Sequence, residues 1–400
     1  MDIPRLQDMD INGRKVLVRA DLNVPLEDGV VADDSRLRAA VPTLRDILDR
    51  GGRPVIIAHL DRPRGERMPE ASLRPLAEAL SGLLDGTRVQ FSEDCIGEEA
   101  ESGATALGEG DCLLCENLRF HPGERDCDAE FSRALARLGD VYVNDAFSAS
   151  HRAHASLVGV PALLPHAAGL LLQREVDTLD RLLGDPKRPY SAILGGAKPA
   201  TKIPVVARLA EKADQILVGG IPAAAFLKAE GCGIGRTEIT DDDLRQAQEV
   251  LGLVKGARGD LILPVDLVTA PDLNARNEVE TVPFDAVPDS HLILDIGSAT
   301  VRMFADAIGA SCTVVWNGPL GAAEREPFQQ GTHFLAAEVG ERTSTGDLVS
   351  VVGGGDTVAF LNRHRMVHLF SYASMAGGAF LSWLAGEDLP GLEALRTPTS

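Results

Sequence analysis

Short apolar runs rich in Val, Ile and Leu recur along the whole chain, and most of them end in Gly, Asn, Asp or His. They are KVLVRADLN, PVIIAHL, CLLCENL, DVYVNDAF, SAILGGA, QILVGG, LILPVDL, TVVWNGP, VSVVGGGD and VHLFSYA. Unbroken runs of this length are typical of parallel strands buried on both faces. Amphipathic stretches with helical spacing, such as 36–50 and 129–139, lie between them. Strand and helix in alternation predict an α/β fold of doubly wound parallel sheets.

The length of the chain indicates two domains, because 400 residues exceed what one ordinary core holds. Residues 158–169 contain two prolines and a closing glycine, and a long helical pattern begins at residue 170. We predict a first domain over 1–168 and a second over 169–388, joined by this helix. Residues 389–400 are predicted to form a tail that returns to the first domain.

Composition excludes several classes of function. The net charge of −20 argues against a general binder of nucleic acid or of anionic membranes, so an anionic substrate must meet a local basic cluster. The start of the chain has no apolar signal core, and no stretch approaches the ~20 apolar residues of a membrane span. We therefore expect a cytoplasmic protein. Of six scattered cysteines only Cys112 and Cys115 have metal-like spacing, and without a second pair we interpret them as structural thiols.

Basic and polar residues follow successive predicted strands in the first half. They are Arg19, Asp21 and Asn23, then His59 and Arg62, then Arg119, then His151 and Arg152, while Arg36 stands at a predicted helix start. Carboxyl ends of parallel strands share one edge of a sheet, so these side chains are predicted to converge. Each arginine alone is more typical of a surface ion pair, but arginines repeated at strand ends suit phosphate and carboxylate. This half is interpreted as a site for a small, doubly anionic molecule.

The second half places glycines after strands, at 195–196, 219–220, 317–319, 353–356 and 377–378. Each is weak evidence alone, but together they offer backbone N–H groups and helix N-termini to phosphates. Lys198 and Lys202 accompany them, and a shared anion would relieve their repulsion. Because proline is poorly tolerated inside a helix, we expect the next helix to begin near Pro204, with Lys202 outside its first turn. Asp356 is either a ligand of a metal-bound phosphate chain or a helix N-cap.

These strings resemble the phosphoglycerate kinase family, in the same order, over about residues 5–395. The resemblance rests on VLVRADLNVPLEDGVVADDSRLRAA, ENLRFHPGE, VYVNDAFSASHRAHASLVGV, ILGGAKPATKI, VVWNGPLGAAEREPF, VVGGGDT and LPGLEAL. It implies two similar α/β domains with a cleft and a hinge between them. The first domain would bind 3-phosphoglycerate and the second Mg-ATP or Mg-ADP, in a monomer.

The resemblance also implies residue roles. Arg19, Asp21, Asn23, Arg36, His59, Arg62, Arg119, His151 and Arg152 match acceptor-site positions. Gly196, Lys198, Lys202, Gly220, Gly297, Asn317, Glu324, Gly354, Gly355, Asp356 and Thr357 match positions around the nucleotide, with Glu324 at the ribose and Asp356 at Mg²⁺. Arg36, Lys202, Gly377 and Gly378 match the group around the transferring phosphoryl. No general base is needed, because a carboxylate acceptor is ionised at neutral pH.

The chain departs from the family at several positions. On the acceptor side these are Asp61, Ser148 and Ala149; on the nucleotide side they are Thr201, Ile221, Pro222, Ser298, Ala299, Met375, Ala376 and Phe380. Ile221 and Pro222 are expected to reshape the base pocket. Three hypotheses stay open: a phosphoglycerate kinase with an altered base pocket, a diverged kinase acting on another phosphorylated or phosphonylated carboxylate, and a non-catalytic relative that binds nucleotide or anions.

Overall fold

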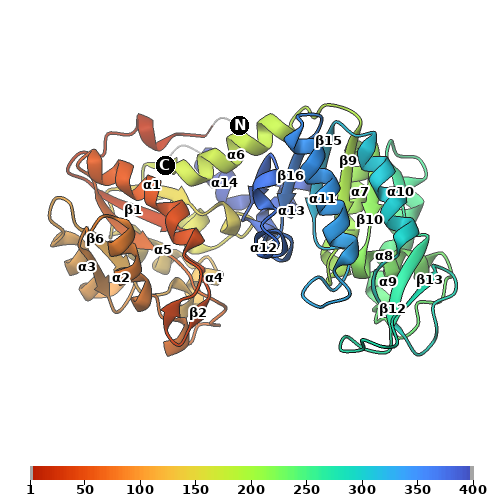
Figure 1. Cartoon of the computed structure of the whole chain (residues 1–400). Coiled ribbons are helices and arrows are strands. Elements are labelled where there is room, and N and C mark those ends of the chain that lie inside the picture. The colour runs from red at the N-terminus through yellow and green to blue at the C-terminus, as the bar shows by residue number, and fades with distance from the viewer. Residues whose placement is uncertain (1–2, 397–400) are drawn as a thin grey trace. The chain divides into compact units, whose positions relative to one another are not determined.

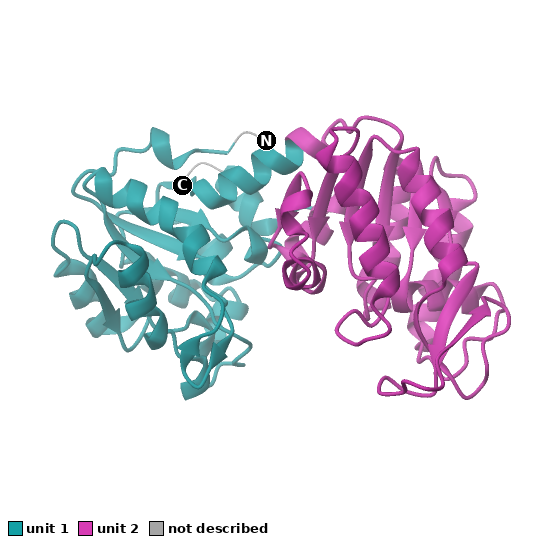
Figure 2. Cartoon of the chain, in the orientation of Figure 1, with its two compact units in different colours: residues 1–180, 388–400 teal, residues 181–387 magenta. Residues whose placement is uncertain are grey.

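The computed structural model describes residues 3–396, which form two compact units (Figure 2). Unit 1 comprises residues 1–180 and 388–400 and unit 2 comprises 181–387, so the chain passes from one to the other within α6 (Leu170–Leu183). The sequence-based limits at residues 168 and 388 stay predictions of the domain boundaries, and residues 397–400 of the predicted tail lie outside the described part. Within residues 3–396, none of the helices has both the length and the apolar character needed to span a bilayer.

The core of unit 1 is a six-stranded parallel sheet in the order β5-β6-β4-β1-β7-β8. The strands are β1 (Lys15–Ala20), β4 (Arg53–Ile57), β5 (Val89–Ser92), β6 (Cys112–Cys115), β7 (Val141–Asp145) and β8 (His166–Ala168). β6 and β7 are buried at every residue, which accounts for their continuous apolar composition. In β1, Arg19 lies level with Ile57 and Asn144 on the flanking strands.

Helices follow the strands of unit 1 (Figure 1). They are α1 (Ser35–Asp49), α2 (Arg74–Leu83), α3 (Gly97–Thr105), α4 (Pro122–Arg125), α5 (Ala129–Ala136) and α14 (Pro390–Arg396), with a hairpin of β2 (Leu26–Glu27) and β3 (Val30–Val31) before α1. The last helix is anchored beside β7: Gly391 N donates to Ser150 O (2.9 Å), and Asn144 Nδ2 donates to Gly391 O (3.3 Å). A side chain at Gly391 would meet Ser150 at 3.0 Å. α14 thus packs in unit 1.

Unit 2 repeats this architecture with a parallel sheet in the order β11-β10-β9-β15-β16-β17. Its strands are β9 (Tyr190–Leu194), β10 (Gln215–Val218), β11 (Asp260–Ile262), β15 (Thr313–Asn317), β16 (Val349–Gly353) and β17 (Tyr372–Ser374). Its helices are α7 (Pro199–Lys212), α8 (Gly220–Ala229), α9 (Asp241–Val254), α10 (Ser298–Gly309), α11 (Gln330–Ser344), α12 (Gly355–Arg363) and α13 (Gly377–Leu384). Two parallel-sheet α/β domains are therefore confirmed.

Unit 2 also contains a small antiparallel sheet that the sequence reasoning missed. Its strands β12 (Asp266–Ala270), β13 (Glu280–Pro283) and β14 (Leu292–Ile296) run in the order β13-β12-β14. The run LILPVDL, expected as one strand, is divided between β11 and β12. The run VHLFSYA likewise begins as a short 3-10 helix, Val367–Leu369, before β17.

The expected start of the helix after the second-half lysines was wrong. α7 begins at Pro199 rather than near Pro204, so Lys202 lies inside its first turns. Pro199 occupies the first helical position, where its missing N–H has no intrahelical partner to lose. Pro204 removes one hydrogen bond near the helix start, and burial of the neighbouring Ile203 and Val205 offsets that loss.

Candidate active site

The guanidinium of Arg19 is held at the carboxyl edge of the unit 1 sheet, with only 1% of the residue exposed. Its Nε donates to Ser156 Oγ (3.0 Å), Nη1 to Ala20 O (2.5 Å), and Nη2 contacts His59 Nδ1 (2.8 Å). Because all three guanidinium nitrogens of Arg19 contact the protein, this side chain is held in place before any ligand binds.

Two histidines beside it, the buried His59 and the half-buried His151, are neutral. Burial, followed by the charges of Arg19 and Arg119, holds the pKa of His59 well below its usual value. Burial and then the neighbouring Arg152 lower the pKa of His151 to about 4. Arg152 Nε lies 3.1 Å from His151 Nε2 and donates to it. At neutral pH the positive charge at this edge therefore comes from the arginines.

The predicted convergence of arginines is visible in their mutual repulsion. Only 4% of Arg119 is exposed, and this burial, followed by the charges of Arg152 and Arg19, lowers the pKa of Arg119 to about 10. Burial, then Arg62 and Arg19, likewise lower the pKa of Arg152. Four guanidinium groups close enough to disturb one another, with Arg62 exposed at the surface, form a site that an anion would stabilise.

Asp21 orients a fifth arginine. Its Oδ2 accepts hydrogen bonds from Arg36 Nη1, in the first turn of α1, and from Ser148 Oγ (2.7 Å). Asn23 holds the loop opposite, because its Oδ1 accepts from the backbone N–H of Asp61 (2.9 Å). Asp61 has a φ of 55°, a left-handed conformation that aspartate tolerates better than most residues. Ser148, which replaces the family's glycine, thus adds a hydrogen bond to the carboxylate that positions Arg36.

A buried carboxylate below Arg19 was missed from the sequence. Glu124 is fully buried in α4, and it accepts from the backbone N–H (2.9 Å) and the hydroxyl (2.7 Å) of Ser156, with His154 Nδ1 at 3.6 Å. Burial would raise the pKa of Glu124, but His154, then the charge of Arg19, bring it below its usual value. Glu124 therefore fixes Ser156, which in turn fixes Arg19. In the sequence, nothing in the string HPGERD distinguishes Glu124 from a solvent-exposed residue at a helix start.

In unit 2 a cavity of about 910 Å³ lies among the loops after β9, β10 and β15, and one face of α12 lines it. Four of the predicted nucleotide residues, Gly196, Gly220, Glu324 and Asp356, line it. Its apolar wall comes from β14, from Leu320 and from Phe360. Ile221, one of the departures from the family, also lines the cavity. A wall of this kind with a few polar groups at one end suits a flat heterocycle carrying an anionic tail.

Lys202 projects from α7 toward the end of β15. Its Nζ donates to Asn317 Oδ1, and 7% of the residue is exposed. Burial, opposed by Asp356 and reinforced by Lys198, lowers the pKa of Lys202 to about 8, so the ammonium is charged at neutral pH but poorly solvated. Asn317 Nδ2 is buried and has no hydrogen-bond partner among the described residues. Two donors thus lie together where an anion would satisfy both.

Two helix N-termini meet beside this lysine. Gly354, with a φ of 101°, turns the chain from β16 into α12, and it lies against the Asn317 side chain. A Cβ at Gly377, the first residue of α13, would lie 3.5 Å from the Gly355 nitrogen. Gly318 N donates to Thr357 Oγ1 (2.9 Å), which fixes the adjoining turn. Backbone N–H groups and helix dipoles therefore point to one place, as in phosphate sites.

Three further positions, two predicted for the nucleotide site and one that departs from the family, do not line the cavity. Gly297 caps α10 and does not line the cavity; a Cβ there would meet the Asp266 carboxylate at 2.3 Å. Phe380 is fully buried, and its ring packs on Gly353, where a Cβ would meet it at 2.3 Å. Lys198 caps α7 and is exposed.

Asp356 is the residue whose chemistry fits a magnesium ion. It lies in the first turn of α12, exposed, on the cavity wall. It is not the N-cap, because Gly354 occupies that position. Mg²⁺ prefers one or two carboxylates combined with phosphate oxygens and water.

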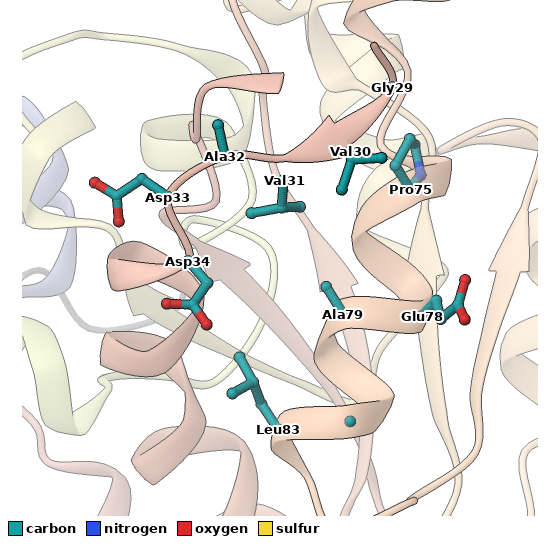
Figure 3. Close-up of a pocket in the computed structure, with 11 residues that line it drawn as sticks. Gly29, Val30, Val31, Ala32, Asp33, Asp34, Pro75, Glu78, Ala79 and Leu83 are labelled. Atoms are coloured by element: carbon teal, nitrogen blue, oxygen red, sulfur yellow. The ribbon is translucent and has the colours of Figure 1, made fainter. Parts of the chain in front are cut away.

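A separate groove in unit 1 has the wrong chemistry for a phosphate. It lies between the β2–β3 hairpin and α2, with Val30, Ala79 and Leu83 on its walls and Asp34 and Glu78 at its rim (Figure 3). None of the described residues that line it is basic. The arginine cluster is therefore the better anion site in this unit.

Comparisons with known proteins agree with this arrangement. A family model described as phosphoglycerate kinase matches residues 6–387. A protein named phosphoglycerate kinase from Cereibacter sphaeroides is 47% identical over 391 residues, covering 98% of each chain. Another from Methylorubrum extorquens is 48% identical over 386 residues, covering 96% of each. The solved phosphoglycerate kinase structure from Coxiella burnetii is similar with a TM-score of 0.85 and 36% identity over 99% of both chains, and that from Pyrococcus horikoshii OT3 with 0.84 and 30% over 98%.

Proposed function

The chain belongs to the phosphoglycerate kinase family, and from this premise we propose that it transfers the γ-phosphoryl group of Mg-ATP to the carboxylate of 3-phosphoglycerate. The product is 1,3-bisphosphoglycerate and the reaction is reversible. The observation that carries the proposal is the pairing of two sites in one chain: an arginine cluster without charged histidines in unit 1, and converging helix N-termini with Lys202 in unit 2.

Unit 1 would bind the acceptor through its arginines. Arg19, Arg62, Arg119 and Arg152 offer forked donors to the phosphate of 3-phosphoglycerate, while His59, His151 and Asn23 shape the pocket. Arg36, directed by Asp21, would face the reacting carboxylate. The carboxylate is ionised at neutral pH, so no residue has to remove a proton. The task of this unit is to hold the attacking oxygen in line with the phosphorus.

Unit 2 would bind the nucleotide. The apolar part of the cavity would take the base, with Gly220 and Ile221 against it and Glu324 at the ribose. Lys198, Lys202, Asn317 and the N-termini of α12 and α13, with Gly354, Gly355, Thr357, Gly377 and Gly378, would surround the phosphate chain. Mg²⁺, held by Asp356 and phosphate oxygens, would neutralise phosphate charge. Lys202 and Arg36 would stabilise the charge on the moving phosphoryl group.

Because the two substrates bind to different units, the proposal includes a hinge motion that brings them together and expels water. Water excluded at that moment cannot hydrolyse the acyl phosphate. We further propose a monomeric, cytoplasmic enzyme of glycolysis that needs no macromolecular partner.

The test is steady-state turnover of 3-phosphoglycerate with Mg-ATP, coupled to reduction of the acyl phosphate, with Mg-GTP run in parallel. Arg36→Met is compared with Arg45→Met on the same helix, where Arg45 is exposed and paired with Asp85. We expect Arg36→Met to lower kcat by about 10²-fold or more and Arg45→Met to change it by less than about twofold. Wild-type protein that binds nucleotide by calorimetry but does not turn over 3-phosphoglycerate would contradict the proposal.

A further inference from the structure

Asp94, Cys95 and His121 lie together in unit 1 although Cys95 and His121 are 26 positions apart in the sequence. One ligand atom from each, a carboxylate oxygen, the thiol sulfur and a ring nitrogen, lies within 4.8 Å of the other two. Asp94 and Cys95 follow β5, and His121 caps the start of α4. No step of the proposed reaction uses this cluster.

The side chains of Asp94 and His121 are held by contacts that do not depend on a cation. Asp94 Oδ1 accepts from the backbone N–H of Cys95 (2.7 Å) and lies 2.7 Å from His121 Nε2. The His121 ring packs against Phe131 with centroids 5.3 Å apart. Cys95 is fully buried, whereas the side chains of Asp94 and His121 are 42% and 28% exposed. The cluster is therefore preorganised, with its sulfur inside and its oxygen and nitrogen toward solvent.

Thiolate, imidazole and carboxylate together are the ligands of a zinc-type cation rather than of Mg²⁺ or Ca²⁺, which require oxygen ligands. In tetrahedral coordination the three ligand atoms would lie at distances from one another that small movements of these side chains can reach. Water would take the fourth position. We propose that Asp94, Cys95 and His121 form a binding site for a zinc-type divalent cation.

Binding has a defined proton balance. Burial, then Cys115 and Asp94, raise the pKa of the Cys95 thiol well above its usual value, so it is protonated without a cation. A bound cation replaces that proton, and one proton is released to solvent for each cation bound. Affinity should therefore increase with pH.

The site also has a structural consequence. His121 stands two residues after Arg119 and three before Glu124. A cation bound here would join the loop after β5 to the segment that carries both of these residues.

The test uses Co²⁺ as an optical probe with the full chain and no nucleotide, so that the site assigned to Asp356 is not involved. One equivalent of Co²⁺ should give a thiolate-to-cobalt charge-transfer band that Zn²⁺ abolishes by displacement. Cys95→Ser should remove the band, and His121→Asn should weaken Co²⁺ binding by about tenfold to a hundredfold. Cys127→Ser is the matched control, because Cys127 is a half-buried thiol of the same unit outside the cluster.

Absence of the band in the wild type, or its persistence in Cys95→Ser, would overturn the proposal. If Cys95→Ser does not fold, His121→Asn decides, since this side chain is partly exposed; unchanged Co²⁺ affinity would then overturn it. Calorimetry of Zn²⁺ binding in buffers of different ionisation enthalpy should give about one proton released per cation. None of these measurements depends on turnover, so they remain decisive whether or not the kinase proposal holds.

Discussion

Replacing Lys202 by Met should make the protein more stable and much less active. The substitution keeps most of the side-chain volume inside α7 and removes the buried ammonium. Its effect on stability follows from the pKa of Lys202, which burial lowers from 10.5 to about 8. At 1.36 kcal/mol per pKa unit, the folded protein holds this charge at a cost of about 3 kcal/mol at neutral pH.

Two effects set the expected magnitude. Loss of the hydrogen bond from Nζ to Asn317 Oδ1 costs about 1–2 kcal/mol, so the net gain in the free energy of unfolding should be about 1–2 kcal/mol. The buried charge of Lys202 also makes the free energy of unfolding depend on pH. Between pH 8 and 10.5 unfolded Lys202 binds more protons than the folded form, so wild-type stability contains a contribution that rises with pH in this window. Lys202→Met should lack that contribution. Its kcat should fall by about 10²- to 10³-fold or more, because the ammonium proposed to stabilise the negative charge of the transition state is lost.

Denaturant unfolding followed by tryptophan fluorescence measures the stability of unit 2, which contains Lys202. Both tryptophans, Trp316 and Trp383, lie in this unit. Lys255→Met is the control, since Lys255 is exposed at the end of α9; it should change stability by less than about 0.5 kcal/mol and leave kcat unchanged. Lys202→Met with kcat within about tenfold of wild type would refute the assignment to the moving phosphoryl group. A loss of stability would refute the electrostatic argument.

Three further outcomes are expected. Burial raises the pKa of Asp295 to about 7, so the native state holds more protons than the unfolded state between pH 3.8 and 7 and this group's contribution falls as pH rises; Asp295→Asn should flatten that slope in pH-dependent denaturation. Arg119→Lys should raise KM for 3-phosphoglycerate by about tenfold to a hundredfold with little change in unfolding, and an unchanged KM would remove Arg119 from the acceptor site. Phe380→Ala should lower the free energy of unfolding by about 3–5 kcal/mol because the ring packs on Gly353, whereas Phe334→Ala, 58% exposed, should cost less than about 0.5 kcal/mol.

Much of the fold follows from periodicity, and its limits are equally physical. β1, β7 and β15 are buried on both faces, so their composition alone identifies parallel strands. The sheet of β12, β13 and β14 was missed because β13 is largely exposed and has little apolar signal. The helix start at Pro199 was missed because proline was weighed by its lost hydrogen bond, without the packing that compensates it.

The site shows the same division. Arginines at strand ends can be predicted to lie together from the sequence, since parallel strands bring their carboxyl ends to one edge of the sheet. Glu124 does not, because its role depends on Ser156 and Arg19, which reach it only through tertiary contacts. The cluster of Asp94, Cys95 and His121 was likewise invisible: the sequence spacing directed attention to Cys112 and Cys115, which lie in a buried strand.

The anchoring of α14 beside β7 has a consequence for synthesis on the ribosome. Asn144 and Ser150 bond to Gly391, and all of unit 2 lies between these two parts of unit 1 in the chain. Unit 1 therefore cannot be completed before the ribosome has synthesised all of unit 2. Since Ser150 adjoins His151, a nascent chain lacks these contacts beside the proposed acceptor site until α14 has been synthesised.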